Sequence, residues 1–199
     1  MTGILQPLIR TNVALLIQKI ALLDLLVARY GSQASDKFAT VCPLVGASIG
    51  QHYRHSMDHV ELAALVANSV GNDASSPLVG ELHYDMRVRG GTLEKDIGLS
   101  RKRLVDVIDV FRSLELQTES ERVMTSPINA YFNLSADSDA DIGLASTVGR
   151  ELGFAAHHAI HHMAMVKVIA VQTLGLKEGE LPHGFGRAPS TLIFDKNEK

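Results

Sequence analysis

The sequence predicts an all-α protein built as an antiparallel four-helix bundle. Four segments carry apolar residues at helical spacing, glycines and prolines interrupt the stretches between them, and seven of the nine histidines fall on two of these segments. A helix with one apolar stripe buries that stripe against other helices, and short loops favour antiparallel neighbours. With 199 residues, 46% of them hydrophobic, the chain is long enough for a single domain with its own core.

The first predicted helix spans residues 4–30 and the second spans residues 48–70. In the first, leucines and isoleucines recur at helical spacing, and Gly31 then supplies a stop signal. In the second, Ser48 followed by Gln51 has the pattern of a capping box, in which each side chain bonds the backbone N–H of the other residue. We therefore expect the second helix to begin at Ser48.

The third and fourth predicted helices span residues 92–116 and 147–174. Thr92 can cap the third helix, and Glu94 and Asp96 in its first turn suit the positive end of the helix dipole. Between these two helices, the segments 121–125 and 130–134 are β-capable and predict a short hairpin. The tail from about residue 176 to residue 199 contains several prolines and glycines, so we expect it to be irregular.

Composition narrows the class of protein. A net charge of −3 argues against a broad nucleic-acid-binding surface. Cys42 is the single cysteine, which excludes an intrachain disulfide and favours a reducing compartment, so we expect a cytoplasmic location. Arg10, Lys19 and Asp24 interrupt the apolar N-terminal stretch, which therefore predicts a bundle helix rather than a membrane span or a transit peptide.

The histidines form two clusters on the second and fourth predicted helices, namely His52, His55 and His59, and His157, His158, His161 and His162. Neutral imidazole is the commonest metal-binding side chain. A helix turns by about 100° per residue, so the first three histidines lie within roughly 60° of one another. His158 and His162 share a stripe with apolar residues and should face the core. One histidine of the second helix and two of the fourth would form a three-nitrogen site with an open position, which is typical of a catalytic metal.

The remaining histidines leave alternatives open. His52 and His161 are candidates for catalytic groups, or for a fourth ligand that would close the site and leave a non-catalytic metal-binding protein. Without a metal, the stripes would face solvent or bond one another in a plain helical bundle with a dimer-forming surface. Imidazole suits several metals; we expect one divalent transition metal, zinc, nickel or iron, with zinc favoured.

Three further residues are candidates for supporting roles. Asp58 follows His55 by three positions and could accept the second N–H of a metal-bound imidazole, or it could face solvent. Asp85 and Arg87 precede the third helix and are candidates for substrate binding, because a guanidinium group binds a carboxylate with two parallel hydrogen bonds. The alternative for this pair is a salt-bridge network within the loop.

Four stretches occur in a characteristic order: SIGQHYRHSMDH at residues 48–59, YDMRVR at 84–89, RELGFAAHHAIHH at 150–162 and FGRAPSTL at 185–192. Together they resemble the DinB/YfiT-like superfamily of metal-dependent proteins. The resemblance implies a four-helix bundle with a His-x-x-x-His pair on the last helix and a third histidine on the second. On this pattern the metal ligands are His55, His158 and His162, with His52 as the rival of His55.

The resemblance also implies a class of chemistry. Some members are thiol S-transferases that use low-molecular-weight thiols such as mycothiol or bacillithiol, and others are thiol-dependent isomerases. We therefore expect a metal-dependent thiol S-transferase acting on a small electrophile, or a related hydrolase, with the metal lowering the pKa of the thiol. A non-catalytic, stress-related bundle protein is the alternative. The expected partners are a small thiol or electrophile and, because relatives are often dimers, a second copy of the chain; nucleic acid and membranes are not expected.

Overall fold

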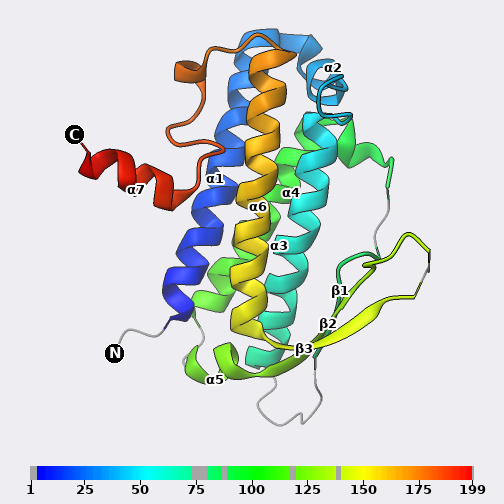
Figure 1. Cartoon of the computed structure of the whole chain (residues 1–199), viewed down its shortest axis with the longest axis vertical. Coiled ribbons are helices and arrows are strands. Elements are labelled where there is room, and N and C mark those ends of the chain that lie inside the picture. Colours follow the sequence, from blue (N-terminus) through cyan, green and yellow to red (C-terminus); the bar gives the residue numbers. More distant parts are fainter. Residues whose placement is uncertain (1–3, 73–79, 87–88, 117–119, 138–139, 199) are drawn as a thin grey trace.

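The computed structural model describes residues 4–72, 80–86, 89–116, 120–137 and 140–198. In this part of the chain four long helices lie side by side, α1 (Leu5–Tyr30), α3 (Ile49–Asn72), α4 (Ile97–Glu115) and α6 (Val148–Gln172) (Figure 1). The shorter elements are η1 (Gly31–Gln33), α2 (Ala34–Ala39), η2 (Thr92–Glu94), α5 (Ser120–Thr125), η3 (Glu178–Glu180) and α7 (Pro189–Asn197). The fold is therefore mainly helical, as predicted.

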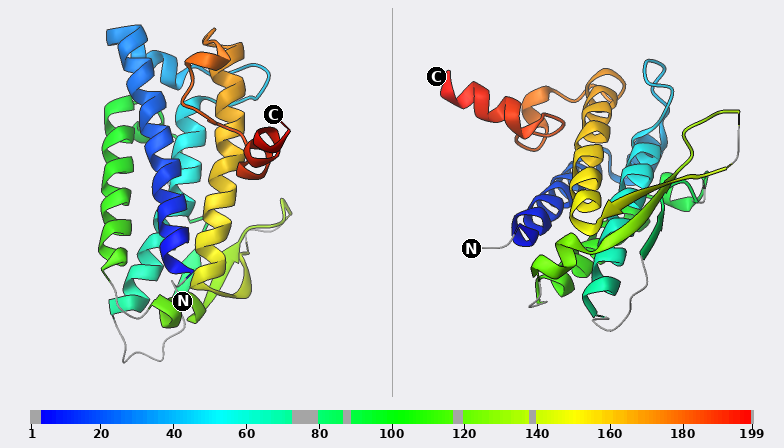
Figure 2. Two further views of the ribbon diagram at one scale, coloured as in Figure 1. Left: turned by 90° about the vertical axis from the view of Figure 1, so that its left-hand side faces the viewer. Right: turned by 60° about the horizontal axis from the view of Figure 1, so that its bottom comes forward.

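A small sheet of three strands accompanies the helices, so the fold is not purely α. Its strands are β1 (Gly80–His83), β2 (Pro127–Phe132) and β3 (Ile142–Thr147), in the order β1-β2-β3. β2 and β3 pair antiparallel, and β1 pairs with β2 in parallel. The sheet lies beside the end of the helices at which α6 begins, whereas α7 extends away from them (Figure 2).

Contacts between the helices define their directions. α3 runs parallel to α4, because Arg54 pairs with Glu94 just before α4 and Asn68 contacts Ser113 near its end. α3 and α6 are antiparallel, as are α1 and α4, whereas α1 and α6 are parallel. The expectation that all neighbours are antiparallel is therefore wrong for two pairs. The chain after α3 returns through β1 and η2 to the end at which α3 begins, and only then enters α4.

The core lies where the four long helices meet. Leu16 and Leu23 of α1, Tyr53 of α3, Phe111 of α4 and Leu152 of α6 are fully buried there. Burial of such side chains is the main force that holds helices of this length together in water. The two helices that carry the histidine clusters are therefore held against each other by the core.

The apolar character of α1 extends beyond its buried face. Within Leu5–Ala39, a window of mean hydropathy 1.7 is long and apolar enough to cross a membrane, and 39% of it is buried. A membrane span was not predicted, because Arg10, Lys19 and Asp24 carry charges. The length and composition of this segment nevertheless meet the requirement for a membrane span. In the structure, the packing of Leu16 and Lys19 against the other helices gives α1 the place of a core helix.

The ends of two helices test the predicted start signals. The capping box at α3 is confirmed, because Ser48 N donates to Gln51 Oε1 at 2.9 Å and Gln51 N donates to Ser48 Oγ at 3.1 Å. The predicted cap at Thr92 is wrong: η2 forms there, and Asp96 caps α4 by accepting a hydrogen bond from Leu99 N at 2.9 Å. Glu94 is buried against Arg54 instead of lying in the first turn of α4.

Several short segments also differ from prediction. Residues 121–125 are helical as part of α5, and the hairpin is formed by β2 and β3 instead. β1 lies between the second and third predicted helices, where no regular element was predicted, and part of the irregular tail forms α7, with Pro189 at its first position. Segments of four to nine residues carry too few periods to separate helix, strand and loop by pattern alone.

Gly50 marks the closest approach between α3 and η2. A Cβ at this position would lie 2.0 Å from the Glu94 carbonyl oxygen, so a side chain fits only if the backbone moves. We therefore expect Gly50→Ala to lower the free energy of unfolding by about 3 kcal/mol, the upper end of the usual cost of overpacking. Urea denaturation followed by circular dichroism measures this change.

Gly153 of α6 provides the matched control, because nothing lies within 4 Å of the position that its Cβ would occupy. Alanine is a better helix former than glycine, so Gly153→Ala should raise the free energy of unfolding by about 0.5–1 kcal/mol. A stabilising effect of both substitutions would show that η2 does not press against α3.

Candidate metal centre

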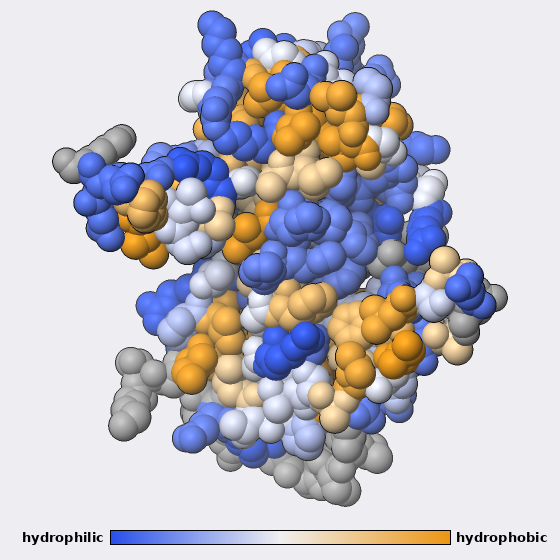
Figure 3. Space-filling model, viewed as in Figure 1, coloured by the Kyte–Doolittle hydropathy of each residue, from blue (hydrophilic) through white to orange (hydrophobic). Residues whose placement is uncertain are grey.

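Antiparallel packing of α3 and α6 brings the two histidine clusters together. His52 and His55 of α3 contact His162 and His158 of α6. The space-filling view shows a hydrophilic patch over α6 and α3, flanked above and below by hydrophobic residues (Figure 3). The clusters therefore lie near the surface, at the seam between two helices that the core holds in place.

Three imidazole nitrogens converge within this seam. His158 Nε2 lies 3.0 Å from His55 Nε2 and 3.1 Å from His162 Nε2. An imidazole nitrogen carries either one N–H or one lone pair, so His158 Nε2 cannot form a good hydrogen bond with both neighbours. A cation that accepts all three lone pairs would account for both contacts. With ligand distances of about 2.0–2.1 Å and tetrahedral angles, its nitrogens would lie roughly 3.3 Å apart.

His59 belongs to the same cluster, although the sequence analysis did not predict it as a ligand. Ligand nitrogens of His55, His59 and His158 lie within 4.8 Å of one another. His59 Nδ1 lies 3.0 Å from the His55 carbonyl oxygen, so it carries the proton and Nε2 keeps its lone pair. Its ring stacks on Tyr84, with centroids 4.6 Å apart. The spacing of four residues from His55 is the signal that could have identified it.

The predicted ligands His55 and His158 occur in both sets of three nitrogens, and His162 and His59 compete for the third position. His52 lies behind His162, with the two Nδ1 atoms 2.7 Å apart. His161 is exposed on α6, and its ring centroid lies 5.3 Å from that of His162. The structure thus brings His52 to the edge of the cluster and leaves His161 facing outward.

The cluster is an environment that disfavours protonated imidazole. Burial lowers the pKa of His162 to about 2, and repulsion from charge on His158 and His55 acts in the same direction. Burial also lowers the pKa of His52, with further repulsion from His161 and Lys19. Both imidazoles are therefore neutral at pH 7, the form that can bind a metal.

The depressed pKa of His162 predicts that the metal-free fold loses stability in acid. The unfolded chain binds a proton at this histidine below about pH 6.5, whereas the folded chain does so only near pH 2. The contribution of His162 to the free energy of unfolding should therefore be constant above about pH 6.5 and decrease steadily as the pH falls below it. Urea denaturation at a series of pH values measures this slope. His162→Gln should flatten the slope, and an unchanged slope in that variant would contradict the assignment.

Aromatic side chains and a buried carboxylate support one side of the cluster. The Tyr84 ring, which stacks on His59, also lies 5.1 Å from Phe132 and 5.6 Å from Phe154 between centroids. Its hydroxyl donates to Glu151 Oε2 at 2.9 Å, and burial beside this carboxylate raises the pKa of Tyr84. Glu151 also accepts from Arg150 at 2.6 Å. These contacts fix the orientation of Tyr84, and through it that of His59.

A buried lysine lies on the opposite side of His52. Lys19 Nζ donates to Ser56 Oγ at 2.5 Å, and Ser56 Oγ in turn donates to the His52 carbonyl oxygen at 2.7 Å. The ammonium group also lies 4.9 Å from the centre of the Tyr53 ring. Burial, together with the charge of Arg103, lowers the pKa of Lys19 to about 7. This contact ties α1 to the turn of α3 that carries His52.

The structure places Asp58 away from the ligand nitrogens. Its Oδ2 accepts from Arg54 at 2.8 Å, and its Oδ1 lies 2.8 Å from Arg103. The expected role of Asp58 as the acceptor for a metal-bound imidazole is therefore corrected. Three residues along a helix rotate a side chain by about 60° from its starting direction. That rotation turns Asp58 from α6 toward α4, where the arginines lie.

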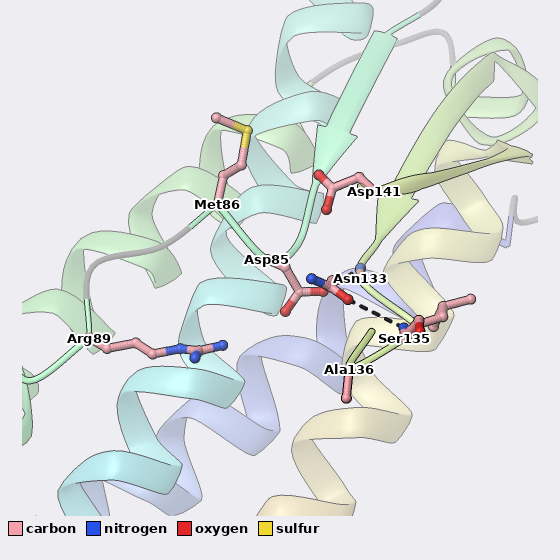
Figure 4. Close-up of a pocket in the computed structure, with 8 residues that line it drawn as sticks. Asp85, Met86, Arg89, Asn133, Ser135, Ala136 and Asp141 are labelled. Atoms are coloured by element: carbon pink, nitrogen blue, oxygen red, sulfur yellow. Dashed lines mark hydrogen bonds between the residues drawn. The ribbon is translucent and has the colours of Figure 1, made fainter. Parts of the chain in front are cut away.

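Asp85 lies beside a cleft near the sheet (Figure 4). The cleft has a volume of about 860 Å³ and is lined by Asp85, Met86, Arg89, Asn133, Leu134, Ser135, Ala136 and Asp141. Asp85 Oδ2 accepts from Asn133 N at 3.0 Å. Asp85 directly follows Tyr84 in the chain, so adjacent residues border the cleft and the histidine cluster. The predicted partner Arg87 lies outside the described residues, and Arg89 was not predicted.

Comparisons with known proteins leave the family of this chain open. No family model and no solved structure match it. It is similar to FK506-binding protein 5 of Rhizopus delemar, with 32% identity over 124 residues. That alignment covers 62% of this chain and 30% of the relative, so the chain spans less than a third of the fungal protein.

Proposed function

We propose that this protein binds one divalent transition metal between α3 and α6. The observation that carries the proposal is the double contact of His158 Nε2 with the Nε2 atoms of His55 and His162, at 3.0 and 3.1 Å. Hydrogen bonding accounts for one of these contacts, whereas a shared cation accounts for both. Partly buried imidazoles fit zinc, nickel or iron in their neutral form, and zinc is favoured because it accepts nitrogen ligands at a tetrahedral site.

We further propose that the chain is a DinB/YfiT-like four-helix bundle whose metal is catalytic. With His55, His158 and His162 as ligands, the fourth position of a tetrahedral ion stays open for water or a thiol. A thiol bound there would have a lowered pKa and would lose its proton more readily, which suits attack of the thiolate sulfur on a small electrophile. The cleft at Asp85 and Arg89 is the proposed place for the rest of the substrate.

A non-catalytic metal protein is the second candidate, and His59 is the observation that favours it. If His59 binds the ion together with His55, His158 and His162, four nitrogens close the tetrahedral site, as in structural zinc centres. The ion would then be held without an open position for a reacting molecule. Binding of FK506, which the name of the Rhizopus protein states, is not part of either proposal, because only 30% of that protein is aligned.

Metal analysis of untagged protein, purified without a metal column, tests the proposal. We expect about one equivalent of metal per chain, or its uptake from added zinc. A folded protein that binds neither zinc nor nickel would refute the metal site.

Cobalt-substituted protein then separates the two candidates. A thiol that enters an open position adds a sulfur-to-cobalt absorption band, whereas a closed four-nitrogen site leaves the spectrum unchanged. If the site is open, a screen of thiols with small electrophiles follows, and the His158→Ala variant supplies the inactive reference.

A further inference from the structure

We infer that His52 is a positioning residue that holds the metal ligand His162 in the tautomer that binds the ion. This inference rests on the metal site proposed above and assigns a separate task to His52. Its basis is the contact between His52 Nδ1 and His162 Nδ1, which are 2.7 Å apart.

The contact contains a single proton, and its position decides what His162 can do. Two imidazole nitrogens at this distance share one N–H, because two lone pairs or two N–H groups would repel each other. If His162 Nδ1 carries the proton, the lone pair of neutral His162 is on Nε2, which faces His158 at 3.1 Å. If His52 Nδ1 carries it, His162 Nε2 holds the N–H and cannot bind a metal. Metal binding therefore requires His52 to be the acceptor.

The surroundings of His52 suit this role. A metal-bound histidine commonly donates its other N–H to a carboxylate, a carbonyl or water. Asp58 was the expected carboxylate, but it pairs with Arg54 and Arg103 instead. A neutral imidazole keeps a lone pair on one ring nitrogen, so Nδ1 of neutral His52 can accept the N–H of His162.

His52 is also held in place on its far side. Ser56 bonds the His52 carbonyl oxygen and receives a hydrogen bond from buried Lys19. With the proton of the contact on His162, the proton of His52 is on Nε2. This atom is buried and has no hydrogen-bond partner among the described residues.

Two substitutions of His52 test the inference through zinc affinity, measured by competition with a chromophoric chelator. His52→Leu removes the acceptor and should weaken zinc binding about 10–100-fold, the usual effect of losing such a partner. His52→Asn places Oδ1 near the position of Nδ1 and should retain affinity within about threefold. His157→Leu, at an exposed position of α6, is the matched control and should bind zinc like the wild type.

Nitrogen-15 NMR of the zinc-loaded wild type supplies a readout that does not depend on the variants. We expect the proton of His52 on Nε2 and that of His162 on Nδ1. Wild-type affinity in a folded His52→Leu protein, equal losses in the Leu and Asn variants, or a proton on His52 Nδ1 would each overturn the inference while the metal site stands. Failure of the wild type itself to bind zinc would instead overturn the proposed function, and this inference with it.

Discussion

His158→Ala should remove stoichiometric metal from the protein. Its Nε2 is the atom that contacts both other proposed ligands, so its loss leaves two nitrogens that no longer surround a common point. We expect zinc affinity to fall by more than the roughly 10–100-fold that follows loss of a supporting residue. Metal analysis after dialysis, and chelator competition for the residual affinity, measure the effect.

His157→Ala is the matched control, because His157 is the adjacent histidine on α6 and is exposed. It should retain the wild-type metal content. Because His157→Ala and His158→Ala contain the same number of histidines, a difference in their metal content cannot arise from that number. Full metal content in His158→Ala would contradict the site. The same assay on His59→Ala and His162→Ala identifies the third ligand as the residue whose loss costs more affinity.

Arg54→Leu should cause the largest loss of stability among the substitutions outside the core. Arg54 is buried and pairs with Glu94 at 2.6 Å and with Asp58 at 2.8 Å. The leucine would leave Glu94 buried without its cation, and breaking a buried ion pair in this way costs about 3–5 kcal/mol. Urea denaturation of the metal-free protein should show this decrease in the free energy of unfolding.

Arg112→Leu provides the comparison for an exposed arginine on α4. Arg112 pairs with Asp109 at 2.8 Å, but both side chains are largely in solvent. Its loss should change the free energy of unfolding by less than about 0.5 kcal/mol. Similar losses for Arg54→Leu and Arg112→Leu would show that the pair at Glu94 is not desolvated as the structure indicates.

Much of the helical framework could be predicted from the sequence because its determinants are local. Apolar spacing over 19 to 26 residues located the four long helices to within a few residues, and Ser48 with Gln51 located the start of α3. Short elements carry less local information. β1, α5 and α7 were therefore missed, and their conformations depend on the neighbours against which they pack.

For the candidate site, local sequence spacing is sufficient to predict that two histidine stripes lie on two long helices. Helical geometry alone places His55 on one face of α3, and His158 and His162 on one face of α6. The packing of the helices is what brings these faces together, adds His59 to the cluster and turns Asp58 toward the arginines. The reason is that the direction of α4 depends on the path of the chain between α3 and α4. Parallel packing of these two helices puts Arg103 beside Asp58, and no spacing within one helix encodes that contact.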